Sequence, residues 1–334
     1  MAERVYIIAE AGVNHNGSTD LALRLVDAAA DAGADAVKFQ TFTADALVLK
    51  SAQKAEYQKA SSGGDETQYE MLKRLELSDA AHRAIMDRCA ERGIQFLSTA
   101  FDPDGVRYLD SLGVPLVKVP SGEITDLPYL RAVSACRKPV ILSTGMSTVD
   151  EIAGAVAVLN GLPVTLLHCT TEYPCPFDSV NLRAMLSIRE RFGLPVGYSD
   201  HTHGIEVAVA AVAMGASVVE KHFTLDRLMS GPDHKASIEP AELARMVTAI
   251  RNVEKSLGDG VKRPADVELK NAAVARKSIV ARCPIRKGEL FSEENLAAMR
   301  PGTGISPMRW DEFVGKAAEI DYQTGDLIKE RNDT

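Results

Sequence analysis

The sequence predicts an α/β fold, a parallel (β/α)8 TIM barrel followed by a small β-rich domain. Short apolar runs alternate with amphipathic stretches of helical spacing over the first 258 residues, as is typical of a parallel sheet covered by helices. Eight such runs occur there, which is the number of strands in a closed barrel of roughly 250 residues. After Gly258 the runs are short and are separated by Lys-Gly, Pro-Gly and Thr-Gly turn signals, which favour a separate β-rich domain.

The predicted strands are rich in Val, Ile and Leu. They are continuous rather than alternating, as expected for parallel strands that are covered on both faces. They are VYIIAEAG (5–12), DAVKFQTF (35–42), IQFLSTAF (94–101), VPLVKVPSGE (114–123), KPVILSTGM (138–146), LPVTLLHCT (162–170), LPVGYSDHT (194–202) and ASVVEKHFT (216–224).

The predicted helices carry recognisable ends. Glycine directly follows several of them, which is a common signal for a helix C-terminus. Another begins beside Thr148, with Glu151 placed as in a capping box. The predicted helices span 20–32, 79–92, 104–112, 148–160, 204–215 and 239–257.

These patterns divide the chain into three segments. We expect residues 1–258 to form the barrel, 259–275 a linker of loop-like composition, and 276–334 the small β-rich domain. Residues 43–78, between the second and third runs, are irregular and contain SSGGDETQ. We expect them to form a loop insertion over the mouth of the barrel.

Composition narrows the class of protein. The 334 residues are 46% hydrophobic and 25% charged, which is ordinary for a globular protein. The net charge of 38 − 46 = −8 argues against nucleic acid or an anionic membrane as a partner. The five cysteines are irregularly spaced without a CxxC pair, which favours reduced thiols. Without a signal-peptide pattern or an apolar stretch of about 20 residues, a cytoplasmic protein is expected.

Polar residues gather at the C-terminal ends of the apolar runs, where barrel enzymes carry their active sites. A charge inside an apolar strand is costly unless it is paired or functional. One such residue would be weak evidence, but the same pattern at all eight runs predicts an active site rather than a merely polar rim.

Two lysines lie within predicted strands, Lys38 in VKF and Lys118 in VKV. If both face one cavity, they form an anion-binding site. Two other interpretations remain open: a pair of structural ion pairs in the core, and a desolvated lysine that forms a Schiff base.

Histidines and glutamates complete the predicted ring. His201 and His222 end neighbouring strands, and neutral imidazoles in that position suit a divalent transition metal, although hydrogen-bonding histidines would give the same pattern. Any one of Glu10, Glu123 and Glu220 could act as a general base if burial tunes its pKa, or could simply balance the lysines.

A series of motifs at these positions resembles the sialic acid synthase family. In chain order the motifs are IAEAGVNHNG, AVKFQTF, STAFD, KVPSGE, LSTGM, HCTTEYP, YSDHT and EKHFTLD followed by MSGPDH. The tail, with RKSIVA, IRKGE and RPGTGISP, resembles the antifreeze-like (SAF) domain of that family. YQK at 57–59 and DETQYEMLKRLELS after it resemble the bacterial branch that makes N-acetylneuraminate or diacetyllegionaminate. HCTTEYP with SGEITDLPYL leans toward the legionaminate type.

The resemblance implies an enzyme that condenses phosphoenolpyruvate with an N-acetylmannosamine-type sugar. The sugar is N-acetylmannosamine or 2,4-diacetamido-2,4,6-trideoxymannose, and the products are a nine-carbon 2-keto-3-deoxy acid and phosphate, released by C–O cleavage. A divalent metal, Mn2+ or Mg2+, polarises the sugar aldehyde.

The resemblance also implies roles for individual residues. Glu10 and Glu220 are the catalytic carboxylates, with Glu10 a candidate for activating water, and His201 and His222 bind the metal. The residues that bind phosphoenolpyruvate are Lys38, Thr99, Lys118, Ser121, Ser143, Thr171 and Ser199. The residues that contact the sugar are Gln40, Glu123, Tyr173, Asp233 and Arg300.

Arg300 lies in the tail, and in the family this arginine comes from the partner subunit of a domain-swapped homodimer. We therefore expect such a dimer here. Thr171 replaces the asparagine, and Phe39 the histidine, that other members of the family carry. These departures affect the identity of the sugar, not the class of reaction.

Three other functions compete with this one. The first is a Schiff-base aldolase that uses Lys38 or Lys118. The second is a related synthase that acts on a sugar of different length. The third is a non-catalytic sugar-phosphate binding protein, for which we would expect binding without turnover.

Overall fold

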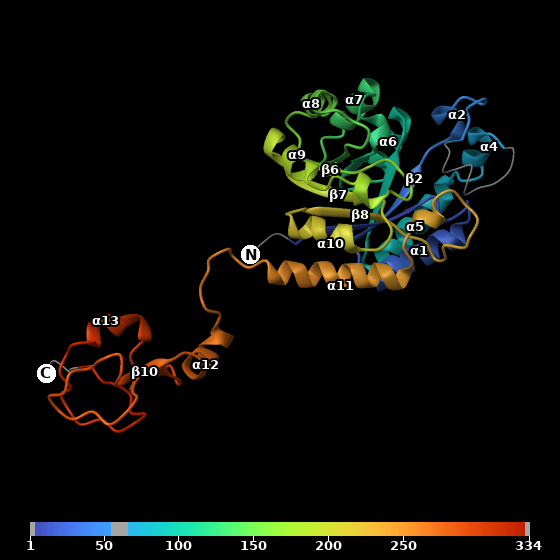
Figure 1. Ribbon diagram of the computed structural model, residues 1–334. Coiled ribbons are helices and arrows are strands. Elements are labelled where there is room, and N and C mark those ends of the chain that lie inside the picture. The colour runs from blue at the N-terminus through green and yellow to red at the C-terminus, as the bar shows by residue number, and fades with distance from the viewer. Residues whose placement is uncertain (1–3, 55–65, 331–334) are drawn as a thin grey trace. The chain divides into compact units, whose positions relative to one another are not determined.

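The computed structural model describes residues 4–54 and 66–330, and the chain divides into two units, Met1–Asp259 and Gly260–Thr334 (Figure 1). The YQK motif at 57–59 lies outside the described residues, as does most of SSGGDETQ. Within the described part, no helix combines the length and the apolar character needed to cross a membrane.

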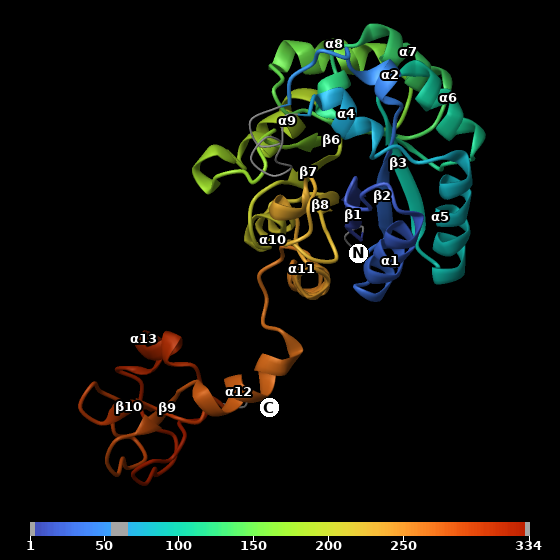
Figure 2. The ribbon, with the colours of Figure 1, turned by 90° about the vertical axis from the view of Figure 1, so that its right-hand side faces the viewer.

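The first unit is a closed barrel of eight parallel strands (Figure 2). Each strand pairs with the next along the chain, and β1 closes the barrel by pairing Glu10 with His222 of β8. This confirms the predicted barrel. The strands are β1 Tyr6–Gly12, β2 Ala36–Thr41, β3 Gln95–Ala100, β4 Val117–Val119, β5 Val140–Ser143, β6 Val164–His168, β7 Val196–Asp200 and β8 Val218–His222.

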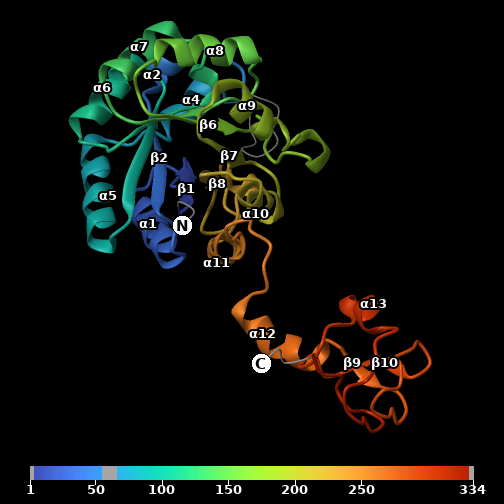
Figure 3. The same cartoon turned by 90° about the vertical axis from the view of Figure 1, so that its left-hand side faces the viewer.

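Helices surround the barrel and bury its outer face (Figure 3). Several begin where the sequence supplies a cap: Ser18 accepts from Leu21 N, and Thr148 forms a capping box with Glu151. Gly93 ends its helix in the left-handed conformation, at φ 65°. The helices are α1 Thr19–Asp31, α5 Asp79–Arg92, α6 Pro103–Ser111, α7 Leu127–Ala135, α8 Val149–Val158, α9 Ala184–Phe192, α10 Glu206–Ala213 and α11 Pro240–Ser256.

Alternate residues of each strand face opposite sides of the sheet. Val37 and Phe39 of β2 face the helices and belong to the main core. Ala36 and Leu97 belong instead to a separate apolar cluster, together with Ile8, Ile141, Leu167 and Val218. This second cluster has the opposite strand parity, so it fills the interior of the barrel.

The structure contains helices that the sequence patterns did not indicate. One of them, α12 (Asp266–Ala275), lies in the segment that we expected to be a loop-like linker. It buries none of its residues, and therefore lacks the apolar stripe that marks a helix in sequence. Helices α7 and α9, of nine residues each, were also not among the predicted helices.

The insertion between β2 and α5 is partly helical, in α2 (Ala44–Leu47) and α4 (Gln68–Lys73). These two helices lie side by side near the C-terminal end of β2 (Figure 1). Val13, Phe42, Met71 and Leu75 pack around them as a small apolar cluster.

The second unit has its own core. An antiparallel pair, β9 (Ser278–Ala281) and β10 (Leu296–Met299), is extended by isolated bridges such as Val280 with Leu327. Ile279, Phe291 and Tyr322 are among the residues of its apolar cluster. A short helix, α13 (Trp310–Phe313), follows β10.

Replacing Lys221 by methionine is expected to destabilise the barrel by about 3–5 kcal/mol, because it leaves a buried carboxylate without its partner. Both Lys221 and Asp200 have fully buried side chains, and their charged atoms are 2.8 Å apart. Urea denaturation measures the loss. The control Lys138→Met removes a half-exposed partner of Asp110 and should cost less than about 1 kcal/mol. Equal effects of the two changes would contradict a structural role for Lys221.

Candidate active site

A ring of side chains lies two residues beyond the apolar layer inside the barrel. Side chains alternate between the two faces of a strand, so residues two positions apart point to the same side. The residue two positions after each interior apolar residue therefore also points into the barrel, nearer its C-terminal end. The interior apolar layer ends at positions such as Ile8, Leu97 and Val218. The residues of the ring are Glu10, Lys38, Thr99, Lys118, Ser143, Cys169, Ser199 and Glu220.

This ring forms the floor of a cavity of about 450 Å3. All but two of the predicted site residues line it. They are Glu10, Lys38, Gln40, Thr99, Lys118, Ser121, Ser143, Thr171, Tyr173, Ser199, His201, Glu220, His222 and Asp233.

The two exceptions are Glu123 and Arg300. Glu123 follows β4 in a short 3-10 turn, adjacent to the lining residue Gly122. Arg300 belongs to the second unit, where its Nε donates to the carbonyl of Ala275 at 3.0 Å. Their contact with the sugar stays a prediction.

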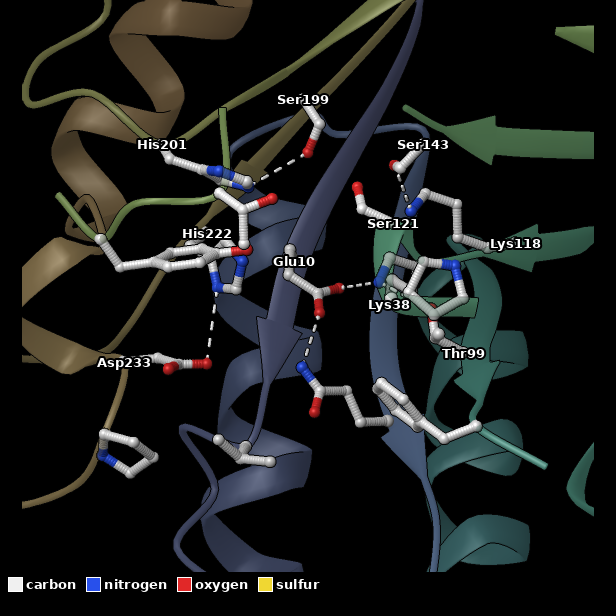
Figure 4. A pocket seen from close by; sticks show the side chains of 18 of the residues that line it. Glu10, Lys38, Thr99, Lys118, Ser121, Ser143, Ser199, His201, His222 and Asp233 are labelled. Atoms are coloured by element: carbon white, nitrogen blue, oxygen red, sulfur yellow. Dashed lines mark hydrogen bonds and ion pairs between the residues drawn. The ribbon is translucent and has the colours of Figure 1, made fainter. Parts of the chain in front are cut away.

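The lysines and glutamates of the ring form one buried network, and Figure 4 shows Glu10, Lys38 and Lys118 in it. Lys38 Nζ is 2.6 Å from Glu10 Oε2, 2.9 Å from Thr99 Oγ1 and 3.7 Å from Glu220 Oε2. Lys118 Nζ is 3.4 Å from Glu220 Oε1 and 2.9 Å from Ser143 Oγ. Two lysines and two glutamates, all buried, therefore pair with one another at the floor of the cavity.

Burial and neighbouring charges drive the pKa values of Glu10 and Glu220 apart. Burial raises the pKa of Glu10 to about 7, against the opposing charge of Lys38. Burial acts on Glu220 as well, but Lys118 and Lys38 together outweigh it and lower the pKa of this carboxyl. Burial also lowers the pKa of Lys118. Two carboxyls whose pKa values are driven apart are typical of acid–base chemistry.

A small cradle beside Lys118 depends on a glycine. Gly145 N donates to Ser121 Oγ at 2.9 Å, and that oxygen is 3.3 Å from Cys169 Sγ. A Cβ at position 145 would lie 2.4 Å from Thr171 Oγ1 and 2.9 Å from Ser121 Oγ. The absence of a side chain at Gly145 thus allows the hydroxyl groups of Ser121 and Thr171 and the thiol of Cys169 to lie close together.

His201 and His222 lie together on the opposite side of the cavity (Figure 4), with ring centroids 5.6 Å apart. His201 Nδ1 is 2.6 Å from the carbonyl oxygen of Thr170, so this nitrogen carries the proton and Nε2 keeps its lone pair. Burial lowers the pKa of His201 and places the pKa of His222 well below its usual range. Both imidazoles are therefore neutral.

The histidine pair fits a divalent metal in part. His222 Nδ1 is buried without a hydrogen-bond partner and is 3.8 Å from Asp233 Oδ2. Burial raises the pKa of Asp233 to about 6. Within residues 4–54 and 66–330, no cluster of three or more His, Cys, Asp or Glu side chains could hold a metal. Two neutral imidazoles form an incomplete set that substrate oxygens or water would complete.

The loop after β1 holds Asp233 in place. Asn14 Nδ2 donates to Ser237 Oγ at 2.9 Å and to the carbonyl of Phe223 at 2.8 Å. Ser237 Oγ in turn donates to the backbone carbonyl of Asp233 at 2.7 Å. The polar residues after β1 thus position a neighbouring loop rather than line the cavity themselves.

Sequence reasoning missed two parts of the lining. Cys169 belongs to the ring and could have been found from its spacing, two residues after Leu167. Apolar residues of the insertion, such as Leu47 and Met71, also line the cavity. The insertion itself was expected over the mouth of the barrel, but nothing in the sequence indicated which of its residues face the cavity, because apolar residues in an irregular segment are ordinary core candidates.

Comparisons with known proteins agree with this arrangement. Residues 25–262 match the NeuB family and residues 276–330 match the SAF domain. The chain is 52% identical to the N,N'-diacetyllegionaminic acid synthase of Campylobacter jejuni, over 98% of this chain and 100% of that protein. It is 49% identical to the synthase of the same name from Legionella pneumophila, over 97% and 93% of the two chains.

Among solved structures, a sialic acid synthetase from Leptospira borgpetersenii in complex with citrate matches with a TM-score of 0.72 and 35% identity. The match covers 80% of this chain and 90% of that one. Matches over both units and nearly the full length of the relatives agree with the motif series along the sequence. The chain belongs to the NeuB family and carries a C-terminal SAF domain.

Proposed function

We propose that this protein condenses phosphoenolpyruvate with 2,4-diacetamido-2,4,6-trideoxymannose to give N,N'-diacetyllegionaminate and phosphate. The observation that carries the proposal is the pair of buried lysines in the barrel cavity, faced by neutral histidines. The choice of sugar rests on the two relatives of about 50% identity, both named diacetyllegionaminic acid synthases.

Phosphoenolpyruvate binds at the lysine side of the cavity. Lys38 and Lys118 supply positive charge to its carboxylate and phosphate, and Ser121, Ser143, Thr99, Thr171 and Ser199 supply hydroxyl donors. Charge-assisted hydrogen bonds of this kind are strong in a buried site. Gly145 keeps this side of the cavity free of a further side chain, because a Cβ there would lie 2.4 Å from Thr171 Oγ1.

The sugar aldehyde binds at the histidine side. His201 and His222 would hold a Mn2+ or Mg2+ ion there, with Asp233 beside it. When bound, such an ion polarises the aldehyde oxygen. The methylene carbon of phosphoenolpyruvate then forms the new carbon–carbon bond, and positive charge develops at its C2. Glu220 lies between the two lysines, and its carboxylate would stabilise this positive charge.

Water adds to C2, and phosphate leaves with the bridging oxygen. Glu10 removes the proton from this water. The raised pKa of Glu10 suits a base that works near neutral pH. Gln40 Nε2 donates a hydrogen bond to Glu10 Oε1 at 3.4 Å and so positions this carboxyl from the mouth side of the cavity. Gln40 also contacts the sugar, together with Tyr173, Asp233 and Glu123.

Activity is expected to fall about tenfold per pH unit below pH 7, because Glu10 then becomes protonated and can no longer accept a proton. A pH profile of kcat/KM measures this fall in activity, which is the acidic limb of the profile. Burial also raises the pKa of Glu123 to about 7, so Glu123→Gln is the matched control. The limb should disappear from the residual rate of Glu10→Gln and persist in Glu123→Gln. The reverse would assign the base to Glu123.

Arg300→Ala is expected to lower kcat/KM for the sugar by roughly ten- to a hundredfold, the worth of one hydrogen bond to a charged group. The KM for phosphoenolpyruvate should stay unchanged. The arginine reaches the N-acyl group from the partner subunit of a domain-swapped dimer. Arg309→Ala, elsewhere in the second unit, is the control. An equal loss for both substrates would contradict this role.

Isotope transfer distinguishes this reaction from its rivals. Phosphoenolpyruvate labelled with 18O in the bridging position should deliver all of its label to phosphate, since the C–O bond breaks. A Schiff-base aldolase would instead take up pyruvate and would be trapped by borohydride on Lys118, whose lowered pKa makes it the better nucleophile of the two lysines. Labelled product with unlabelled phosphate, or borohydride trapping, would refute the proposed reaction.

A further inference from the structure

The insertion between β2 and α5 presents an apolar face to the cavity. Residues Leu47, Val48, Met71 and Leu72 come from the insertion, and Val13 and Phe101 come from the loops after β1 and β3. We call these six residues the apolar wall. They line the same cavity as the lysine and histidine pairs, yet the mechanism above uses none of them.

The apolar wall is held in place by polar contacts among neighbouring side chains of the insertion. Asp45 accepts a hydrogen bond from Tyr69 Oη at 2.7 Å. It also forms an ion pair with Lys73 at 3.1 Å. Glu76 accepts from the backbone N of Ala44 at 2.7 Å. These contacts join α2 to α4 through exposed polar groups, so the apolar side chains are left to face the small cluster and the cavity.

The apolar wall lies farther along the strands than the catalytic ring. Val13 follows Glu10 of β1 by three residues, and Phe101 follows Thr99 of β3 by two. Leu47 and Val48 come after the end of β2, beyond Lys38. The ring is therefore the floor of the cavity, and the apolar wall is its side toward the mouth, over β1, β2 and β3.

We propose that the apolar wall binds the far end of the sugar and selects the diacetamido substrate over N-acetylmannosamine. This inference rests on the proposed function. C1 of the open-chain sugar must reach phosphoenolpyruvate at the floor, so C4, C5 and C6 extend toward the mouth. The diacetamido sugar carries an acetamido methyl on C4 and a methyl at C6, where N-acetylmannosamine carries hydroxyls.

The preference follows from the cost of removing groups from water. Two methyl groups against the apolar wall gain from burial, whereas two hydroxyls there lose hydrogen bonds to water without finding partners. A single methyl in an apolar pocket is typically worth about tenfold or more in kcat/KM. We therefore expect the wild-type enzyme to prefer the diacetamido sugar by at least about a hundredfold.

Leu47→Asn tests the proposal, because asparagine has the same branched arrangement of side-chain heavy atoms as leucine and replaces the two methyls with an amide. It should lower kcat/KM for the diacetamido sugar at least about tenfold and change that for N-acetylmannosamine less than about threefold. The matched control is Leu49→Asn, two residues away, where the side chain is 79% exposed and does not line the cavity. The KM for phosphoenolpyruvate should be unchanged in both variants.

Val48→Thr is a second variant, of unchanged shape, in case Leu47→Asn perturbs the insertion. Equal losses for the two sugars in both variants, or an unchanged preference, would overturn the inference and leave the proposed function standing. If wild-type enzyme with Mn2+ turned over neither sugar, the proposed function would fail, and this inference with it.

Discussion

Lys118→Met is expected to lower kcat/KM for phosphoenolpyruvate by at least about thirtyfold. Removing one partner of a buried, hydrogen-bonded charge pair costs about 2–5 kcal/mol, and each 1.4 kcal/mol is a factor of ten. Lys118 is 3% exposed, and its ammonium group contacts Ser143 and Glu220 at the floor of the cavity. Steady-state phosphate release at varied phosphoenolpyruvate concentration measures the loss.

Methionine keeps the length of the lysine stem, so the cavity should keep its shape. Glu220 also retains Lys38 at 3.7 Å, which limits the damage to folding. Lys138→Met serves again as the control and should keep full activity. If Lys118→Met left the KM for phosphoenolpyruvate unchanged and lowered only kcat, this lysine would act in the chemical step rather than in substrate binding.

His222→Ala should abolish metal-dependent turnover and weaken Mn2+ binding by more than about a hundredfold. Loss of a group in the second shell of a metal site already costs ten- to a hundredfold, and His222 is proposed as a direct ligand. Among the residues that the structure describes, its buried Nδ1 has no hydrogen-bond partner. Titration of Mn2+ by electron paramagnetic resonance measures binding independently of activity.

The control for this change is His203→Ala. His203 is exposed and lies two residues from His201, but it does not line the cavity. It should bind Mn2+ and turn over as the unchanged enzyme does. If His222→Ala bound Mn2+ normally, the metal would have to be placed elsewhere, and His222 would be a hydrogen-bonding group for the sugar.

The barrel could be predicted because its strands are covered on both faces. Continuous apolar runs such as VYIIAEAG have few other interpretations, and the observed strands lie within the predicted ranges. The polar residues at the ends of the runs also come together in space, since most of them line one cavity. By contrast, α12 has no buried residues, so nothing in its pattern distinguished it from a linker.

The pairing of charges inside the site could not be predicted. Sequence places Glu10, Glu123 and Glu220 at equivalent positions, but only the barrel register brings Glu10 and Glu220 to the lysines. Glu123 falls beyond the short strand β4, on a turn outside the cavity lining. The apolar wall could not be predicted for a similar reason: its residues come from the two short helices α2 and α4 and from two loops, and the orientation of these segments depends on tertiary contacts.

The most direct test is phosphate release by the unmodified enzyme with phosphoenolpyruvate and Mn2+, comparing the diacetamido sugar with N-acetylmannosamine. Release that requires both sugar and metal, with the higher kcat/KM for the diacetamido sugar, is the predicted result. Phosphate release without sugar, or none with either sugar, would contradict the assignment of this cavity as a phosphoenolpyruvate-dependent synthase site.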